Sequence, residues 1–140
     1  MAGTNKTIGG GGFHHLAIRC KDIDASAKFY TEVLGFKFKI GWGEKPKRVM
    51  LFDTGDGAYF ELFERPQSTP ATEEGTLLHV ALRTTDCKAA MERVKKAGCE
   101  ITMELTDLPL ASTQGPTTIR IGFFKGPDGE LIEFFEHDIT

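Results

Sequence analysis

The sequence predicts an α+β protein made of two tandem modules, each with the element order β-α-β-β-β. Two repeated patterns carry this prediction. The pattern His–apolar–Ala–apolar–Arg–x–x–Asp occurs at residues 15–22 and again at residues 79–86. The pattern Asp–Gly–x–x–x–Glu–x–Phe–Glu occurs at residues 56–64 and again at residues 128–136. Two matched blocks in the same order indicate an internal duplication of one supersecondary unit.

Length and composition are those of one ordinary globular domain. The chain has 140 residues, of which 40% are hydrophobic and 26% charged, and its formal net charge is −3. The only dense basic cluster, "KPKR" at residues 45–48, is typical of a solvated turn, so we expect no nucleic-acid partner. The eleven phenylalanines fit either a well-filled core or an apolar cavity, and both interpretations remain open.

The sequence predicts a cytoplasmic protein with no membrane contact. No apolar run approaches the roughly 20 residues that span a bilayer, and the N-terminus lacks the apolar stretch of a secretion signal. Residues 1–12 contain four consecutive glycines, whose ordering entropy favours a flexible tail. The cysteines are odd in number and lack CxxC spacing, so we expect reduced structural thiols at Cys20, Cys87 and Cys99.

The first module is predicted to span residues 13–64. Residues 13–20 alternate and are rich in strand formers, which predicts a strand. A helix follows, capped by Asp22 or Asp24 and ended by Gly35. We expect its buried stripe to contain Ile23, Ala27, Phe29, Tyr30, Val33 and Leu34. Three further strands are predicted at residues 36–42, 47–54 and 58–64, with a tight turn at "GDG" before the last.

The second module repeats this order over residues 76–137, after a linker at residues 65–75 that is rich in proline and small polar residues. The predicted elements are a strand at 76–84, a helix at 86–98, and strands at 99–105, 117–125 and 130–136. The offset between the modules grows from 64 residues at the first pattern to 72 at the second. We assign the extra residues to a loop at 106–116.

The duplication yields four equivalent positions with metal-binding side chains. His15 and His79 begin the first strand of each module, and Glu61 and Glu133 lie midway along the last strand. If the first and last strands of each module lie side by side, a pseudo-twofold axis brings two imidazoles and two carboxylates together. Such a set suits a borderline divalent cation.

A structural role for these residues is the alternative. A single strand histidine is more often a satisfied structural residue than a ligand, and Glu61 alone fits an exposed position. However, the strands around both glutamates are apolar on both faces, where an ionised carboxylate needs a cation. This setting favours the ligand interpretation for the whole set.

Four nearby polar residues are not expected to bind the metal. His14 does not align with His79, so we expect a surface or supporting position for it, and His137 has no partner in the repeat. Glu64 and Glu136 have opposite-face parity to the proposed carboxylates and are expected to be solvated.

The motifs "HHLAIRCKDIDASAKFYTEVLGF", "YFELFE", "LLHVALRTTD" and "GPDGELIEFFE" resemble the vicinal oxygen chelate (VOC) superfamily, also called the glyoxalase/bleomycin resistance/dioxygenase fold. The resemblance covers residues 13–137. It implies a single VOC domain in which the paired modules form a curved mixed sheet with a metal cleft, and commonly a homodimer. The ligands that it implies are His15, Glu61, His79 and Glu133, holding one divalent ion per site: Ni, Zn, Co, Mn or Fe.

A full His/Glu/His/Glu set is most similar to glyoxalase I. This resemblance implies a metal-dependent lyase or isomerase (related to lactoylglutathione lyase), in which Glu133 transfers a proton through a metal-bound enediolate and Glu61 is its symmetric counterpart. The implied substrate is a small vicinal-oxygen compound, such as a thiol hemithioacetal of methylglyoxal. Arg65 stands where glyoxalase I usually has asparagine; Arg65 or Arg19 either binds a substrate oxyanion or has a surface role. The alternative functions are a small-molecule binding or resistance protein and a metal-dependent ring-cleaving dioxygenase.

Overall fold

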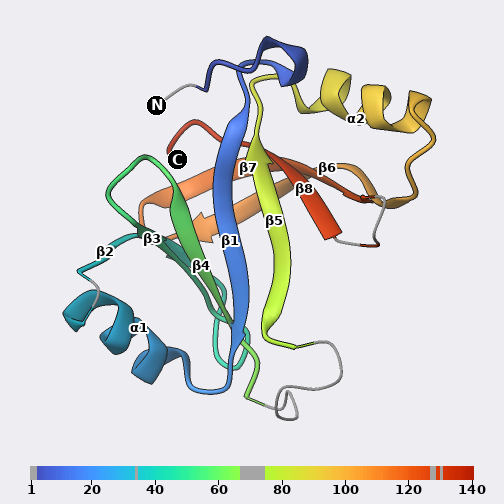
Figure 1. Cartoon of the computed structure of the whole chain (residues 1–140). Helices are drawn as coiled ribbons and strands as arrows, with labels where there is room; N and C mark the ends of the chain where they lie inside the picture. Colours follow the sequence, from blue (N-terminus) through green and yellow to red (C-terminus); the bar gives the residue numbers. More distant parts are fainter. Residues whose placement is uncertain (1–2, 34, 67–74, 127–128, 130) are drawn as a thin grey trace. The chain divides into compact units, whose positions relative to one another are not determined.

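The computed structural model describes residues 3–33, 35–66, 75–126, 129 and 131–140 (Figure 1). Its contacts divide the chain into two compact units. The first unit contains residues 15–78 and 110–117; the second contains the residues up to His14, residues 79–109 and residues 118–140. The elements are η1 (Lys6–Ile8), β1 (Gly12–Cys20), α1 (Ile23–Glu32), β2 (Lys37–Trp42), β3 (Val49–Asp53), β4 (Tyr59–Glu64), β5 (Leu77–Arg83), α2 (Cys87–Lys96), β6 (Ile101–Ser112), β7 (Gly115–Lys125) and β8 (Leu131–Glu136).

In the first unit the strand order is β2-β3-β4-β1. β1 runs parallel to β4, whereas β2 and β3, and β3 and β4, pair antiparallel. Helix α1 is capped by Asp22, whose carboxylate accepts a hydrogen bond from the Ala25 amide at 3.0 Å. The helix packs on one face of the sheet through a buried cluster of Ile18, Cys20, Ile23, Phe52 and Leu62.

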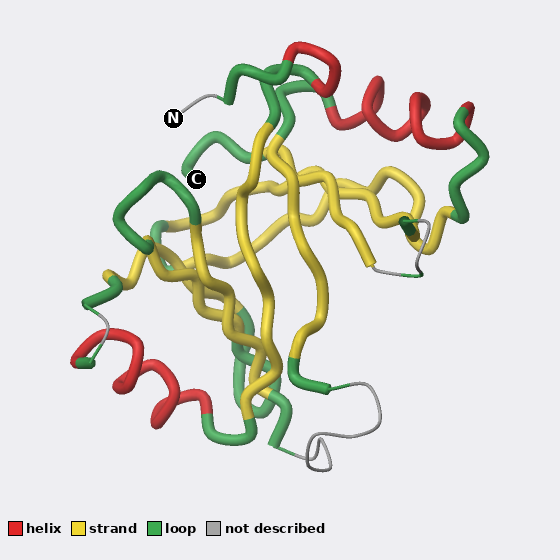
Figure 2. Tube along the Cα trace, in the orientation of Figure 1, coloured by secondary structure: helices red, strands yellow, loops and turns green. Residues whose placement is uncertain are grey.

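The second unit repeats this arrangement with the order β5-β8-β7-β6. β5 runs parallel to β8, and β7 pairs antiparallel with β8. Helix α2 is capped by Asp86, whose carboxylate accepts a hydrogen bond from the Ala89 amide at 2.9 Å. Its buried cluster consists of Cys87, Ala90, Met91, Phe124 and Phe134. Figure 2 shows α1 and α2 as the long helices of the described residues. The predicted pair of βαβββ modules in an α+β fold is therefore confirmed.

The predicted buried stripe of α1 is wrong at two positions. Ile23 is buried, and Ala27 and Tyr30 pack against the cluster, but Phe29 and Val33 are 48% and 65% exposed. A helix of ten residues contacts the sheet along a single stripe, and these two side chains lie on the neighbouring stripe. Leu34 lies outside the described residues.

The predicted loop at residues 106–116 is also wrong. β6 and β7 continue through it and turn only at residues 113–114. The pair spans residues 101–125, whereas its counterpart β2–β3 spans residues 37–53, so the extra eight residues lengthen a hairpin. Pro109 suggested a loop, but β6 is an edge strand of the sheet. At an edge, the amide hydrogen-bond donor that proline lacks is not needed for pairing.

The tip of this hairpin belongs to the first unit. The Thr113 amide donates a hydrogen bond to the Gly41 carbonyl at 2.9 Å, and the Gly41 amide donates to the Thr113 hydroxyl at 3.0 Å. The Gln114 side chain donates to the Lys39 carbonyl at 2.7 Å. The hairpin tip therefore completes the backbone hydrogen bonding of β2.

The glycine-rich N-terminal segment, predicted as a flexible tail, makes defined contacts over residues 3–11. It forms the short helix η1, and the Asn5 side chain accepts a hydrogen bond from the Thr7 amide. Gly9 and Gly10 adopt φ angles of 71° and 78°, which other residues rarely reach. The Thr85 amide then donates to the Gly9 carbonyl at 3.0 Å. The glycines thus allow the turn that leads into β1.

The three cysteines are free thiols, as predicted. Cys20 and Cys87 are buried, and burial raises the pKa of both, that of Cys87 to about 12. Most of the predicted linker lies outside the described residues, at 67–74. Within the described part of the chain, no helix has the length and apolar character needed to cross a membrane.

Candidate metal-binding site

The first unit contains a buried histidine–glutamate pair. His15 lies on β1 and Glu61 on the neighbouring parallel strand β4. Their Nε2 and Oε2 atoms are 2.9 Å apart, and the side chains are 0% and 3% exposed. The structure therefore brings together the two candidate ligands of the first module.

The strand register explains this contact. Ile18 and Leu62 pack against α1, so His15, Ala17 and Glu61 point to the opposite face of the sheet. Ala17 lies directly opposite Glu61 and is fully buried. Because alanine is small, the imidazole two residues earlier reaches past it to the carboxylate. The alanine of the repeated pattern is therefore a spacer.

The second unit repeats this geometry. Ala81 lies directly opposite Glu133 in the β5–β8 register and is also fully buried. His79 Nε2 and Glu133 Oε2 are 3.0 Å apart. The same three side chains thus form the same pair in each unit.

The two pairs differ in their neighbours. The residue opposite Glu133 on β7 is Phe123, whose ring meets the His79 imidazole edge-on, with 5.1 Å between centroids. The residue opposite Glu61 on β3 is the fully buried Leu51. The His79 side chain is 7% exposed, against 0% for His15. The second pair is therefore the more accessible one.

The donor atoms of both pairs fit a divalent cation. As whole residues, Glu61 and Glu133 are 2% and 4% exposed, and burying a carboxylate is costly without a cation or several hydrogen-bond donors. Imidazole Nε2 and carboxylate oxygen are both ligands that zinc, nickel, cobalt, manganese and iron accept. The residues present thus suit a metal ion.

The expectation that Glu64 is solvated is wrong. Glu64 is 8% exposed, and its carboxylate accepts hydrogen bonds from Arg48 Nε at 2.9 Å and Arg48 Nη2 at 2.8 Å. Arg48 also forms a two-pronged pair with Asp24 in the first turn of α1. The guanidinium lowers the pKa of Glu64 from 4.5 to about 2. This network ties α1 to β3 and β4.

Glu136, the counterpart of Glu64, is also engaged. Its carboxylate accepts a hydrogen bond from the Cys87 amide at 2.8 Å and lies 4.0 Å from Arg120, the counterpart of Arg48. Both glutamates therefore hold neighbouring elements together. Glu64 binds the arginine that precedes β3, and Glu136 accepts a hydrogen bond from the first residue of α2.

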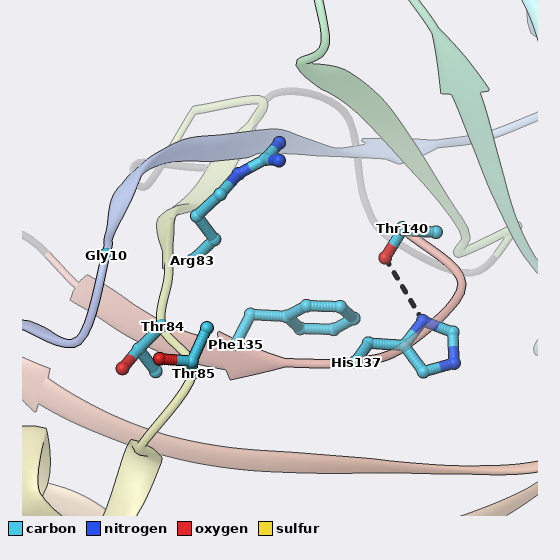
Figure 3. A pocket seen from close by; sticks show the side chains of 7 residues that line it. All are labelled: Gly10, Arg83, Thr84, Thr85, Phe135, His137 and Thr140. Carbon is cyan, nitrogen blue, oxygen red and sulfur yellow. Dashed lines mark hydrogen bonds between the residues drawn. The ribbon is translucent and has the colours of Figure 1, made fainter. Parts of the chain in front are cut away.

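Of the two positions expected for His14, at the surface or in support of the site, the surface position is wrong. His14 is 1% exposed, and its Nε2 lies 2.9 Å from the Thr140 hydroxyl. His137 Nδ1 contacts the same hydroxyl at 3.1 Å (Figure 3). The Phe135 ring packs against His14 with 4.3 Å between centroids. Sequence reasoning missed this cluster because its members lie at opposite ends of the chain.

The two arginines considered for substrate binding lie in the first unit. Arg19 is half-buried on β1, opposite Phe63. The Arg65 guanidinium lies 5.2 Å from the centroid of the Phe63 ring, and its Nη1 donates to the Glu64 carbonyl at 2.8 Å. Arg65 thus packs against the end of β4.

Comparisons with known proteins agree with this architecture. The profile of the Glyoxalase/Bleomycin resistance protein/Dioxygenase superfamily matches residues 12–134. The uncharacterized protein YwbC of Bacillus subtilis is 35% identical over 127 residues, which cover 87% of this chain and 94% of that protein. The lactoylglutathione lyase of Haemophilus influenzae is 30% identical over 132 residues, covering 90% and 93%.

Solved structures show the same fold. Methylmalonyl-CoA epimerase from Mycobacterium tuberculosis superposes with a TM-score of 0.71 at 23% identity, covering 91% of this chain and 88% of that one. A hypothetical protein from Bacillus halodurans superposes with a TM-score of 0.70 at 18% identity, covering 93% and 96%.

Proposed function

Because the chain belongs to the Glyoxalase/Bleomycin resistance protein/Dioxygenase superfamily, we propose that it is a metal-dependent lyase or isomerase of the glyoxalase I type. One observation carries the proposal: each unit buries a histidine against a glutamate in the same strand register. A protein that only packs its core, or only binds an apolar molecule, has no use for this duplicated pair.

Under this proposal His15, Glu61, His79 and Glu133 hold one divalent ion. A bound ion would supply Lewis-acid chemistry, which would make the C–H bond beside the substrate carbonyl more acidic. The chain itself supplies the proton transfer. A glutamate carboxylate takes the proton from the hydroxyl-bearing carbon beside the carbonyl and returns it to the carbonyl carbon, while the hydroxyl proton passes to the former carbonyl oxygen. The reaction is a net isomerisation and consumes no oxidant or reductant.

Glu133 is the better candidate for the base. Its partner His79 is the more accessible histidine, and Phe123 beside it is only partly buried. A substrate therefore reaches the second pair more easily than the fully enclosed first pair. Glu61, the equivalent of Glu133 in the first module, then serves as a metal ligand.

The names of two relatives support the substrate class that we propose. Proteins about 30% identical over most of this chain carry the name lactoylglutathione lyase. We propose a thiol hemithioacetal of a 2-oxoaldehyde as the substrate, and a homodimer as the working assembly, in line with the family.

Elemental analysis combined with turnover tests the proposal. The purified full-length protein is analysed for Ni, Co, Zn, Mn and Fe and assayed with methylglyoxal plus several thiols. Glu133→Gln removes the base but keeps the side-chain volume. Glu92→Gln makes the same change on the exposed face of α2 and serves as the control.

Near-stoichiometric metal, with turnover lost in Glu133→Gln and kept in Glu92→Gln, supports the proposal. Metal without turnover on any hemithioacetal, but with oxygen uptake on a catechol, favours the dioxygenase alternative. No metal retained after reconstitution contradicts the four-ligand site and favours a small-molecule binding protein.

A further inference from the structure

The outward faces of α1 and α2 carry opposite charge patterns. The two helices occupy equivalent places in the duplication, 64 residues apart, and have ten residues each. One outward row of each helix holds three exposed charged side chains at intervals of four residues. The rows are Asp24, Lys28 and Glu32 on α1, and Lys88, Glu92 and Lys96 on α2. At every position of this row, the charge on one helix is therefore the reverse of the charge on the other.

The neighbouring outward row differs in bulk. Its members, all exposed, are Ala25, Phe29 and the cap Val33 for α1, and Ala89, Arg93 and the cap Ala97 for α2. Phe29 and Val33 are 48% and 65% exposed and lie one helical turn apart, so they form a small apolar patch. Helix α1 thus presents large apolar side chains where α2 presents small alanines beside a guanidinium.

The outward face of α2 contains an open hollow of about 590 Å³. Its lining residues are Ala89, Glu92, Arg93, Lys95 and Lys96. A hollow of this volume has room for an aromatic ring, and the guanidinium beside it is attracted to the face of such a ring. An exposed aromatic side chain is what α1 offers at Phe29.

An antiparallel alignment of α1 with α2 sets every charge of the first row against its opposite. The resulting pairs are Asp24–Lys96, Lys28–Glu92 and Glu32–Lys88. The same alignment brings Phe29 to Arg93 in the second row. The helix dipoles favour this direction, because it sets the acidic first turn of α1 beside the basic last turn of α2.

Two like faces do not complement each other. In the antiparallel alignment, two α1 faces would set Asp24 against Glu32 and Lys28 against its own copy. Two α2 faces would set lysine against lysine and Glu92 against its own copy. Like charges at such distances destabilise a contact. The pattern therefore selects one combination, α1 with α2, and because both faces are exposed in the single chain, the partner helix belongs to another copy.

We propose that α1 of one copy of this chain docks antiparallel on α2 of a second copy. A ten-residue helix is about 15 Å long and about 10 Å wide, so the contact covers much less than the roughly 800 Å² per partner of a standard interface. The association is therefore weak, reversible and sensitive to salt. Each copy carries one face of each kind, so the contact is heterologous and either closes into a ring or extends.

The contacts within the chain leave the charged row available. Asp24 binds Arg48 at 3.0 Å with each carboxylate oxygen, yet its side chain is 63% exposed. A carboxylate has about four acceptor sites, so a second cation can bind it. Lys95, which pairs with Glu104, lies outside both rows.

The first test is sedimentation equilibrium of the full-length protein from micromolar to millimolar concentration. We expect the average molar mass to rise with concentration. The rise should be smaller in about 1 M than in about 0.1 M NaCl, because the screening length falls from about 10 Å to about 3 Å. The mass at high concentration also shows whether the contact closes or extends.

The second test exchanges one charge pair. Glu32→Lys and Lys88→Glu, each alone, should weaken association about threefold to tenfold, because each sets like charges against each other. An equal mixture of the two variants should recover association, since the reversed charges then meet. Both substitutions suit the helix dipoles, so the variants should fold. Glu44→Lys makes the same change at an exposed position before β3 and should associate like wild type.

The outcomes separate this contact from other surfaces. Recovery when Glu32→Lys is mixed with Lys96→Glu, instead of Lys88→Glu, overturns the antiparallel alignment. A protein that does not associate at any concentration overturns the proposal. Association that is unchanged by salt and by both charge reversals also overturns it, because the copies are then held through another surface. Neither measurement involves a metal or turnover, so the result is independent of the proposed function.

Discussion

Replacing the spacer Ala17 by valine should separate the first candidate ligand pair. Ala17 is fully buried and lies directly opposite Glu61, and His15 reaches the carboxylate across it. Valine adds two carbons at a point where the imidazole and carboxylate approach to 2.9 Å. Overpacking of this kind costs about 1–3 kcal/mol of stability, which a domain with roughly 5–15 kcal/mol tolerates.

The larger effect should be on metal affinity. Displacing a side chain that orients a ligand typically weakens metal binding by about tenfold to a hundredfold. Stability is measured by urea unfolding, and affinity by competition with a chromophoric chelator for Zn²⁺ or Co²⁺. Ala25→Val, on the exposed face of α1, adds the same two carbons away from the pair and should leave affinity unchanged.

Ala17→Gly is the complementary variant. It removes volume rather than adding it, so His15 and Glu61 stay within reach and metal affinity should fall far less than in Ala17→Val. Wild-type affinity in a folded Ala17→Val protein would refute the spacer argument, because the pair would then tolerate a bulky neighbour.

Three further outcomes follow from the described contacts. The pKa of Glu64 is lowered to about 2 beside Arg48, so this carboxylate stabilises the fold above its ordinary pKa of 4.5 and loses that contribution as pH falls from 4.5 towards 2. Arg48→Gln should flatten the dependence of the urea midpoint on pH over that range. Truncating the buried Phe134 to alanine should cost about 3–5 kcal/mol in the same assay, against little for Phe29→Ala, whose ring is 48% exposed. Because burial raises the pKa of Cys87 to about 12, iodoacetamide at pH 8 should modify the partly exposed Cys99 and spare Cys87 until the protein unfolds, which peptide mass spectrometry detects.

The fold could be predicted from the sequence because the same element order is encoded in both modules. Capping aspartates, glycine stops and alternating strands recur in both halves, so each half supports the interpretation of the other. The same comparison identified His15, Glu61, His79 and Glu133 as a set. Their pairing within each unit depends on register, and the fixed two-residue offset past Ala17 and Ala81 became visible only in the structure.

Features that depend on contacts between residues far apart in the chain could not be predicted from the sequence. Pro109 and the small polar residues near it favour a loop locally, but a strand at the end of the sheet tolerates them. Glu64 was assigned to solvent by strand parity, and only the structure places Arg48 beside it. The Thr140 hydroxyl meets a histidine 126 residues away, for which no local pattern exists.

Each unit is completed by a segment from far along the chain. Gly41 of the first unit pairs with Thr113, 72 residues later, and Gly9 of the second unit receives a hydrogen bond from Thr85, 76 residues later. During synthesis, β2 therefore cannot form its hydrogen bonds with the hairpin tip until Thr113 has left the ribosome. The N-terminal turn likewise cannot form its hydrogen bonds until Thr85 has been synthesised. A nascent chain stopped after the first module lacks these partners, so we expect protection from proteolysis to appear late in translation, in a single step rather than module by module.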